Sequence, residues 1–255
     1  MTTARIVSSP ATQDRTVQSS VGNPGSDWHW LYKLGGAAAL FSVLIIPIQL
    51  IVFTTTPEPV TAAGWFTLFQ GNKLLGLLSF EILFVVNAAL GITTTLALYI
   101  ALRRVNESFM TIALAFSLVG TVCIIIARPA IDMLYLSDQY ATATTDAQRS
   151  MMLAAGEAMI SIRHGMAFHV SYNLANIVLL IVPLVMLQSH IFSKTTAYVG
   201  ILAGVIGFGL YLPTIGLYIS IFSVLFYGVF SVLIGRRLLQ LGRFDRETLQ
   251  PVLSR

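Results

Sequence analysis

The chain has 255 residues, of which 56% are hydrophobic and only 10% are charged, with a formal net charge of +4. An average soluble domain is about 25% charged, so this composition excludes an ordinary soluble domain, a disordered chain and a nucleic-acid-binding protein. The single cysteine, Cys123, excludes an internal disulfide framework and a thiolate-bound zinc or iron–sulfur site. The composition predicts an all-α, polytopic membrane protein whose partner is the lipid bilayer and not a nucleic acid.

Six segments are apolar over enough residues to cross a bilayer, which takes about 20 residues of helix. The second is long enough to tilt or to emerge from the bilayer. The fifth is short, and only Pro213 and Thr214 separate it from the sixth. We expect a transmembrane domain over residues 34–234, with six spans at residues 34–53, 74–102, 111–127, 166–187, 197–212 and 215–234.

The distribution of the basic residues predicts the orientation of these spans in the membrane. If the N-terminus is cytoplasmic, most of the 15 Lys and Arg lie inside, and the outer side holds only Lys73, Arg128, Arg149 and Arg163. Cytoplasmic loops carry the excess of Lys and Arg in membrane proteins. We therefore expect both termini in the cytoplasm, with a flexible tail over residues 1–33 and a basic tail over residues 235–255. Trp65, in the first outer connection, is typical of an anchor at the membrane interface.

The outer connection over residues 128–165 is long enough to carry structure of its own. Pro129 suits the first turn of a helix, on which Asp132 and Tyr135 would share a face. Thr145 and Gln148 have the spacing of a capping box at the start of a second helix. The apolar stripe of that helix indicates either an amphipathic helix lying on the outer leaflet or a lid over a pocket that opens outward.

Ionisable and polar side chains gather in the outer third of the predicted membrane region. Such groups normally face the interior of the bundle and find partners. Arg128 is the natural partner of Glu81 if the second and third spans pack antiparallel. This group indicates a structural ion pair, a proton or cation site, or an anchor for the polar head of a ligand. The candidate ligand-binding or ion-pair residues are Glu81, Asn87, Arg128, Asp132, Tyr135, His164, His169, Tyr172 and Asn173.

A metal site is an alternative for part of this group. His164 and His169 are five residues apart, which places them about 140° apart around an ideal helix. Gly165 can mark the start of the helix and leave His164 on the preceding loop. Glu81 and Asp132 would then complete a set of oxygen and nitrogen ligands. The competing interpretation is that each histidine caps a helix or forms a hydrogen bond at the interface. No cofactor is predicted.

The fifth predicted span is rich in glycine. Gly200 and Gly204 form a G-x-x-x-G pattern, which allows two helices to approach closely. This pattern indicates either the face of a homo-oligomer or packing within the chain.

Four stretches together resemble a known family. They are Ala101–Asn106, Leu134–Tyr140, Ala167–Tyr172 and Thr196–Gly204. In these stretches the chain resembles a family of bacterial multi-pass membrane proteins described only as a domain of unknown function. The resemblance runs from about the first span to Gly242. It implies a protein of the bacterial inner membrane with about six helices, and it implies no activity, substrate or catalytic residue.

Three classes of function remain open at this stage. A non-enzymatic protein would bind a lipid or small amphiphile in an outward-facing polar pocket, and it needs only a cavity and an entrance. An intramembrane enzyme, with or without a metal, would use Glu81, Asp132, His164 and His169. A small ion-coupled transporter would use Glu81 and Arg128, but the inner halves of the spans hold almost no ionisable group. We favour the binding protein.

Overall fold

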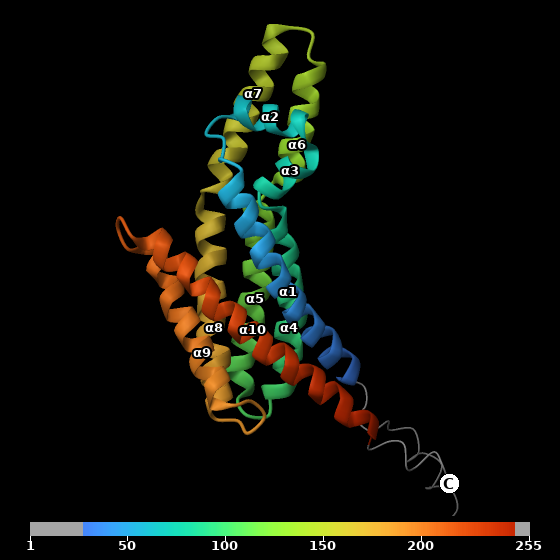
Figure 1. The fold of residues 1–255 in the computed structure, drawn as a ribbon, viewed down its shortest axis with the longest axis vertical. Helices are drawn as coiled ribbons and strands as arrows, with labels where there is room; N and C mark the ends of the chain where they lie inside the picture. Colours follow the sequence, from blue (N-terminus) through green and yellow to red (C-terminus); the bar gives the residue numbers. More distant parts are fainter. Residues whose placement is uncertain (1–27, 248–255) are drawn as a thin grey trace, which may run out of the picture.

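The computed structural model describes residues 28–247, and the regular structure in that range is helical (Figure 1). The predicted tails therefore lie mostly outside it, at residues 1–27 and 248–255. The tail boundaries differ from our expectation at both ends. Helix α1 already begins at His29, and α10 continues to Glu247.

The helices divide into two groups. The main bundle consists of α1 (His29–Thr55), α4 (Ile82–Leu102), α5 (Glu107–Ala127), α8 (Met166–Leu187), α9 (Lys194–Gly207) with the 3-10 turn η2 (Phe208–Tyr211), and α10 (Gly216–Glu247). The second group covers one end of the bundle, at the top of Figure 1, and we call it the cap. The cap consists of α2 (Ala62–Gly71), α3 (Lys73–Ser79), α6 (Ala130–Thr142) and α7 (Asp146–Arg163).

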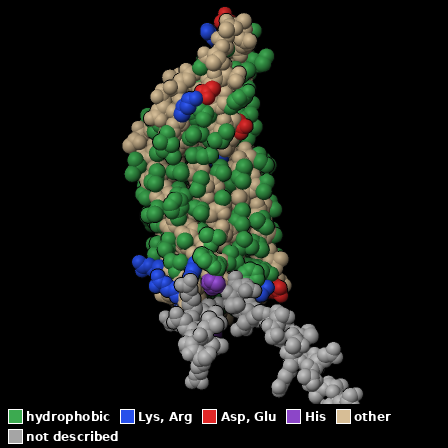
Figure 2. Space-filling view, turned by 90° about the vertical axis from the view of Figure 1, so that its right-hand side faces the viewer, with side chains coloured by type: hydrophobic (Ala, Val, Ile, Leu, Met, Phe, Trp, Pro, Cys, Tyr) green, Lys and Arg blue, Asp and Glu red, His purple; other side chains and the backbone are tan. Residues whose placement is uncertain are grey.

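The described chain contains six helical segments long and apolar enough to cross a membrane. Hydrophobic side chains cover the middle of the face in Figure 2, and the charged side chains on that face lie toward its two ends. A soluble protein of this size would not expose so many large apolar residues. The protein is therefore a multi-pass helical membrane protein, which confirms the predicted fold class.

The second predicted span is not one helix. We expected a continuous span over residues 74–102, but the chain breaks between α3 and α4 at Glu81, whose backbone is left-handed with φ 65°. A left-handed residue other than glycine costs about 1–3 kcal/mol and needs support from its surroundings. Neither Gly nor Pro marks the break in the sequence. The leucines of α3 resemble a membrane segment by composition, although α3 belongs to the cap.

The outer connection forms a helical hairpin. Helix α7 begins with the predicted capping box, because the Thr145 side chain accepts from the backbone of Gln148 and the Gln148 side chain returns to the backbone of Thr145. The expected amphipathic helix thus exists, but residues Met152 and Met159 of its apolar stripe pack on the hydrophobic core of the cap. Trp65 is fully buried in that core, so its predicted role as an interfacial anchor is wrong.

The bundle has its own hydrophobic core, at the end away from the cap. Gly200 and Gly204 serve packing within the chain there. A Cβ added to Gly200 would lie 2.6 Å from Pro183 of α8 and 2.7 Å from Phe230 of α10. A Cβ on Gly204 would lie 2.9 Å from Leu180 of α8. The close approach that the G-x-x-x-G pattern predicts is therefore one between α9 and its neighbours in the same chain.

Candidate functional site

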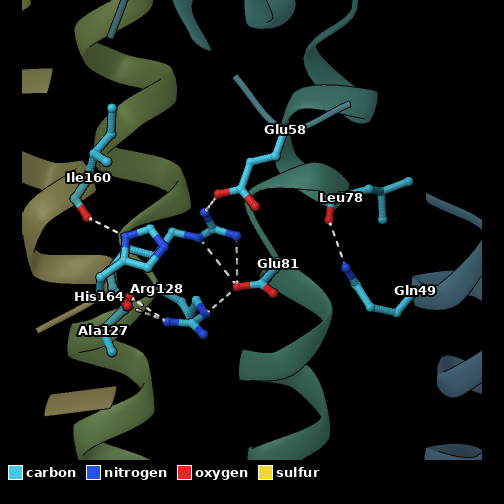
Figure 3. Close-up of polar contacts among 9 residues, drawn as sticks. Gln49, Glu58, Leu78, Glu81, Ala127, Arg128, Ile160 and His164 are labelled. Atoms are coloured by element: carbon cyan, nitrogen blue, oxygen red, sulfur yellow. Dashed lines mark hydrogen bonds and ion pairs between the residues drawn. The ribbon is translucent and has the colours of Figure 1, made fainter. Parts of the chain in front are cut away.

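The chain crosses between the bundle and the cap four times, and one charged residue lies at each of these four crossings. Glu58 lies between α1 and α2, and Glu81 lies between α3 and α4. Arg128 lies between α5 and α6, and Arg163 ends α7 just before α8 begins. These four side chains meet, and we call them the junction network (Figure 3). The network holds together four points of the chain that are far apart in sequence.

The carboxylate of Glu81 is the centre of the junction network. Its Oε2 atom lies 2.6 Å from Nε of Arg128 and 3.1 Å from Nη2 of Arg163. Nε of Arg163 donates a hydrogen bond to the same oxygen at 3.3 Å. The contact with Arg128 is an ion pair without hydrogen-bond geometry, because Nε of Arg128 has no hydrogen-bond partner. Arg163 also forms an ion pair with the carboxylate of Glu58.

Arg128 connects the network to the backbone. Its Nη1 donates to the carbonyl oxygen of Arg163 at 2.9 Å and to that of Ala127 at 3.1 Å. Aromatic rings cover both arginines. The guanidinium of Arg128 lies 4.7 Å from the centre of the Phe168 ring, and that of Arg163 lies 5.4 Å from the centre of the Phe80 ring. Such contacts stabilise a cation away from water.

Burial separates one member of the network from the other three. The side chains of Arg128, Glu81 and Arg163 are 6%, 8% and 4% exposed, whereas that of Glu58 is 39% exposed. Buried charges are stable only when they are paired. The two carboxylates and two guanidiniums give a formal charge of zero, and this balance depends on the partly exposed Glu58.

Two clefts adjoin Glu58. The smaller, of about 100 Å³, is lined by Val52, Phe53, Thr56, Glu58 and Ser79. The larger, of about 310 Å³, is lined by Glu58, Pro59, Val60, Ile160 and His164. Both combine apolar walls with polar groups. Ser79 is 9% exposed, and its hydroxyl has no hydrogen-bond partner among the described residues.

The structure divides the other predicted site residues among separate places. His164 lies on the wall of the larger cleft, and its Nδ1 is 3.1 Å from the carbonyl oxygen of Ile160. Asn87 is in α4, with its side-chain oxygen buried and without a hydrogen-bond partner in the described chain. Asp132 and Tyr135 are exposed on α6 and are not part of the junction network.

His169, Tyr172 and Asn173 form a second polar group, where α8 meets η2. The side-chain amide of Asn173 donates to the hydroxyl of Tyr211 at 2.6 Å, and Nδ1 of His169 lies 3.3 Å from the same oxygen. The Tyr172 hydroxyl donates to the carbonyl oxygen of Gly207 at 2.7 Å. These three residues therefore connect α8 to the turn before α10.

The candidate metal ligands do not converge. Within residues 28–247 no three His, Cys, Asp or Glu side chains lie close enough together to hold a metal ion. Glu81 contacts two arginines, whose positive charge disfavours a cation beside it. His169 bonds Tyr211, and Asp132 is exposed on α6. The set of Glu81, Asp132, His164 and His169 is not assembled here, either as a metal site or as a catalytic group.

Sequence reasoning missed Glu58 and Arg163. From the sequence, Arg163 is only one of the outer basic residues that indicate topology. One signal could have identified it, because Arg128 and Arg163 both mark the boundary between a predicted span and the outer connection. For Glu58 the signal is the surrounding Pro57 and Pro59, which hold a charged residue in a non-helical linker.

Comparison with known proteins identifies the family. Residues 30–236 match the family described as Domain of unknown function (DUF4386), and the chain belongs to this family. The match covers the bundle and the cap, from the start of α1 into α10. Neither the curated proteins nor the solved structures gave a match.

Proposed function

We propose that this membrane protein binds a lipid or small amphiphile where the cap meets the bundle. The polar head of the ligand would lie beside Glu58 and Ser79, and its apolar tail would lie along Val52 and Phe53 of α1. The observation that carries the proposal is the Ser79 hydroxyl, which is buried in the wall of a cleft and lacks a hydrogen-bond partner. A buried hydroxyl without a partner costs about 1–3 kcal/mol, and a ligand in the cleft would provide that partner.

The surroundings of the cleft suit an amphiphile. Phe53 is 49% exposed on α1, directly beside the polar residues Thr56 and Glu58 of the same cleft. A ligand with one polar and one apolar end matches this change of character along one wall. A small polar solute would leave the exposed apolar wall uncovered.

We place the site on the outer side of a bacterial inner membrane, with both termini in the cytoplasm. The end of the bundle opposite the cap holds the larger share of the basic residues of the described chain: Lys33, Arg103, Arg104, Lys194, Arg236, Arg237 and Arg243. The positive-inside rule puts that end in the cytoplasm. The cap and both clefts then face outward. A homo-oligomer stays a further prediction.

A catalytic role is less well supported. The enzyme hypothesis requires Glu81, Asp132, His164 and His169 to act on one reacting atom, and their contacts place them apart. A binding site needs only the clefts and the unpaired hydroxyl. We therefore propose binding without catalysis, and we expect no metal ion or other cofactor to be needed.

Native mass spectrometry of protein released gently from its own membrane tests this function. We expect a bound amphiphile that is lost from the Ser79→Ala variant. The matched control is Ser42→Ala, because Ser42 of α1 is also a buried serine. Ser42 lies ten residues before Val52, about 15 Å along the helix, and so lies away from the cleft. A ligand retained equally by the two variants, or no ligand in any sample, contradicts the proposal.

A further inference from the structure

We propose that Glu58 is an exchangeable counterion, and that the ligand carries an anionic head group, a carboxylate or a phosphate, that replaces Glu58 on Arg163. This inference rests on the proposed function, since it names the chemistry of the ligand at that site. Its basis is the arrangement of charge, burial and cleft around Arg163.

The charge balance requires a second anion. Both arginines approach the same oxygen of Glu81, so a single carboxylate faces two guanidiniums. Glu58 supplies the second negative charge. If Glu58 moves away, a net charge of +1 remains in a buried place, and a buried unpaired charge is strongly unfavourable. Only another anion restores the balance.

Three members of the network are held in place. Arg128 donates to two backbone carbonyls and lies against Phe168. The guanidinium of Arg163 lies 5.6 Å from the Trp65 ring centre and 5.4 Å from that of Phe80. Glu81 immediately precedes α4, accepts a hydrogen bond from Arg163 and forms ion pairs with both arginines. Moving any of these side chains would break several contacts at once.

Glu58 is held differently. It lies in the non-helical linker between α1 and α2, and within the described residues its polar contact is with Arg163. Its side chain is already 39% exposed, so water can solvate the carboxylate as it leaves. Of the four side chains, Glu58 is the one that can depart with the smallest loss.

The position of Glu58 also gives a ligand access to Arg163. Glu58 lines both the cleft beside Ser79 and the cleft beside His164. Because Glu58 pairs with Arg163, the departure of its carboxylate would uncover the guanidinium of Arg163 toward the clefts that Glu58 lines. A carboxylate or phosphate bound there can accept from the forked N–H donors of Arg163 and from the free hydroxyl of Ser79. Both head groups share this chemistry, so the ligand is a fatty acid or an anionic phospholipid.

The experiment compares Glu58→Gln with the unchanged protein in binding assays. The probes are oleate, dioleoyl phosphatidylglycerol, zwitterionic dioleoyl phosphatidylcholine and inorganic phosphate, each titrated against protein in a neutral detergent. Trp65 lies against Arg163, so its fluorescence reports the exchange when Trp28 and Trp30 are replaced by Phe. The control is Asp138→Asn, which removes one negative charge from an exposed ion pair elsewhere in the cap.

We expect Glu58→Gln to tighten binding of an anionic amphiphile about tenfold or more, the effect of removing a competing ion pair. Glu58→Gln should bind phosphatidylcholine as the unchanged protein does. Asp138→Asn should bind every probe with the affinity of the unchanged protein. The probe that responds, oleate or phosphatidylglycerol, identifies the head group. A response to inorganic phosphate as strong as to the lipids would identify a free anion as the ligand. That result would overturn the proposal that the ligand is an amphiphile.

The inference and the proposed function can fail separately. Unchanged or weaker binding of anionic lipid by Glu58→Gln, with binding still lost in Ser79→Ala, overturns the exchange and leaves the function intact. No binding of any lipid by either protein overturns both. Because loss of Arg163 can prevent folding, Arg163→Lys is used with a melting curve. The lysine keeps the positive charge but lacks the forked N–H donors of arginine. This variant should therefore bind anionic lipid more weakly while the protein still melts cooperatively.

Discussion

Removing Glu81 should destabilise the protein more than removing any other member of the junction network. Breaking a buried ion pair by deleting one partner costs about 3–5 kcal/mol, because the other charge is left buried and unpaired. Glu81→Gln leaves Arg128 without a carboxylate and Arg163 with only the partly exposed Glu58, since both arginines contact Oε2 of Glu81. Arg128→Gln leaves Glu81 paired with Arg163, so its effect should be smaller, at about 3 kcal/mol or below.

The double variant gives the sharper test. The double variant should lose less stability than the two single losses added together. The difference should be about 0.5–3 kcal/mol, the range measured for residues in contact. The assay is equilibrium unfolding in mixed micelles, followed by circular dichroism. The control pair is Lys73 and Asp138, whose charged atoms are 2.8 Å apart but whose side chains are 59% and 47% exposed. Lys73→Gln should change stability by about 0–1 kcal/mol. Additive losses for Glu81→Gln and Arg128→Gln would refute the central role of the buried pair.

Three further predictions concern the cap, the α9–α10 turn and the orientation. Gly156→Ala should destabilise the cap by about 1–3 kcal/mol and speed its proteolysis, because the new Cβ would lie 2.7 Å from Ala62. A Cβ added at Gly91 of α4 would meet nothing within 4 Å, so Gly91→Ala should stabilise the protein by up to about 1 kcal/mol. Equal effects of Gly156→Ala and Gly91→Ala on stability would contradict the close packing at Gly156. Thr214 is β-branched with φ 70°, so Thr214→Gly should raise the melting temperature by relieving about 1 kcal/mol or more of strain. In a cysteine-free protein in intact cells, a membrane-impermeant maleimide should label a cysteine at position 138 and not one at position 194, and the reverse would overturn the orientation.

The helical segments could largely be predicted from the sequence because each depends on a local property. Length and hydropathy alone identify a membrane-spanning helix, and each of the six expected spans overlaps one such helical segment. The capping box at Thr145 and Gln148 is equally local. The break at Glu81 could not be predicted in this way, since the leucines of α3 have the composition of a span. At the break, Glu81 has a left-handed backbone, and its carboxylate forms ion pairs with arginines 47 and 82 positions later in the chain.

The candidate site was predictable only in part. Glu81 and Arg128 both fall in the outer third of adjacent predicted spans, which indicates a pairing, and the structure places their charged atoms 2.6 Å apart. Glu58 and Arg163 are 105 residues apart and meet only because the cap folds back on the bundle. Their contact has no local signal. The separation of His164 from His169 likewise follows from tertiary contacts, because one lies beside the larger cleft and the other beside Tyr211.

Photo-crosslinking tests the central claim most directly. An amphiphile that carries a diazirine on its tail is added to membranes that contain the protein, irradiated, and mapped by mass spectrometry of the peptides. The account predicts adducts on α1 near Val52 and Phe53 that unlabelled oleate or phosphatidylglycerol competes away and that Ser79→Ala removes. Adducts spread evenly over the apolar surface of the bundle, or gathered around His169 and Tyr211 and unaffected by Ser79→Ala, would contradict an amphiphile site at the junction of cap and bundle.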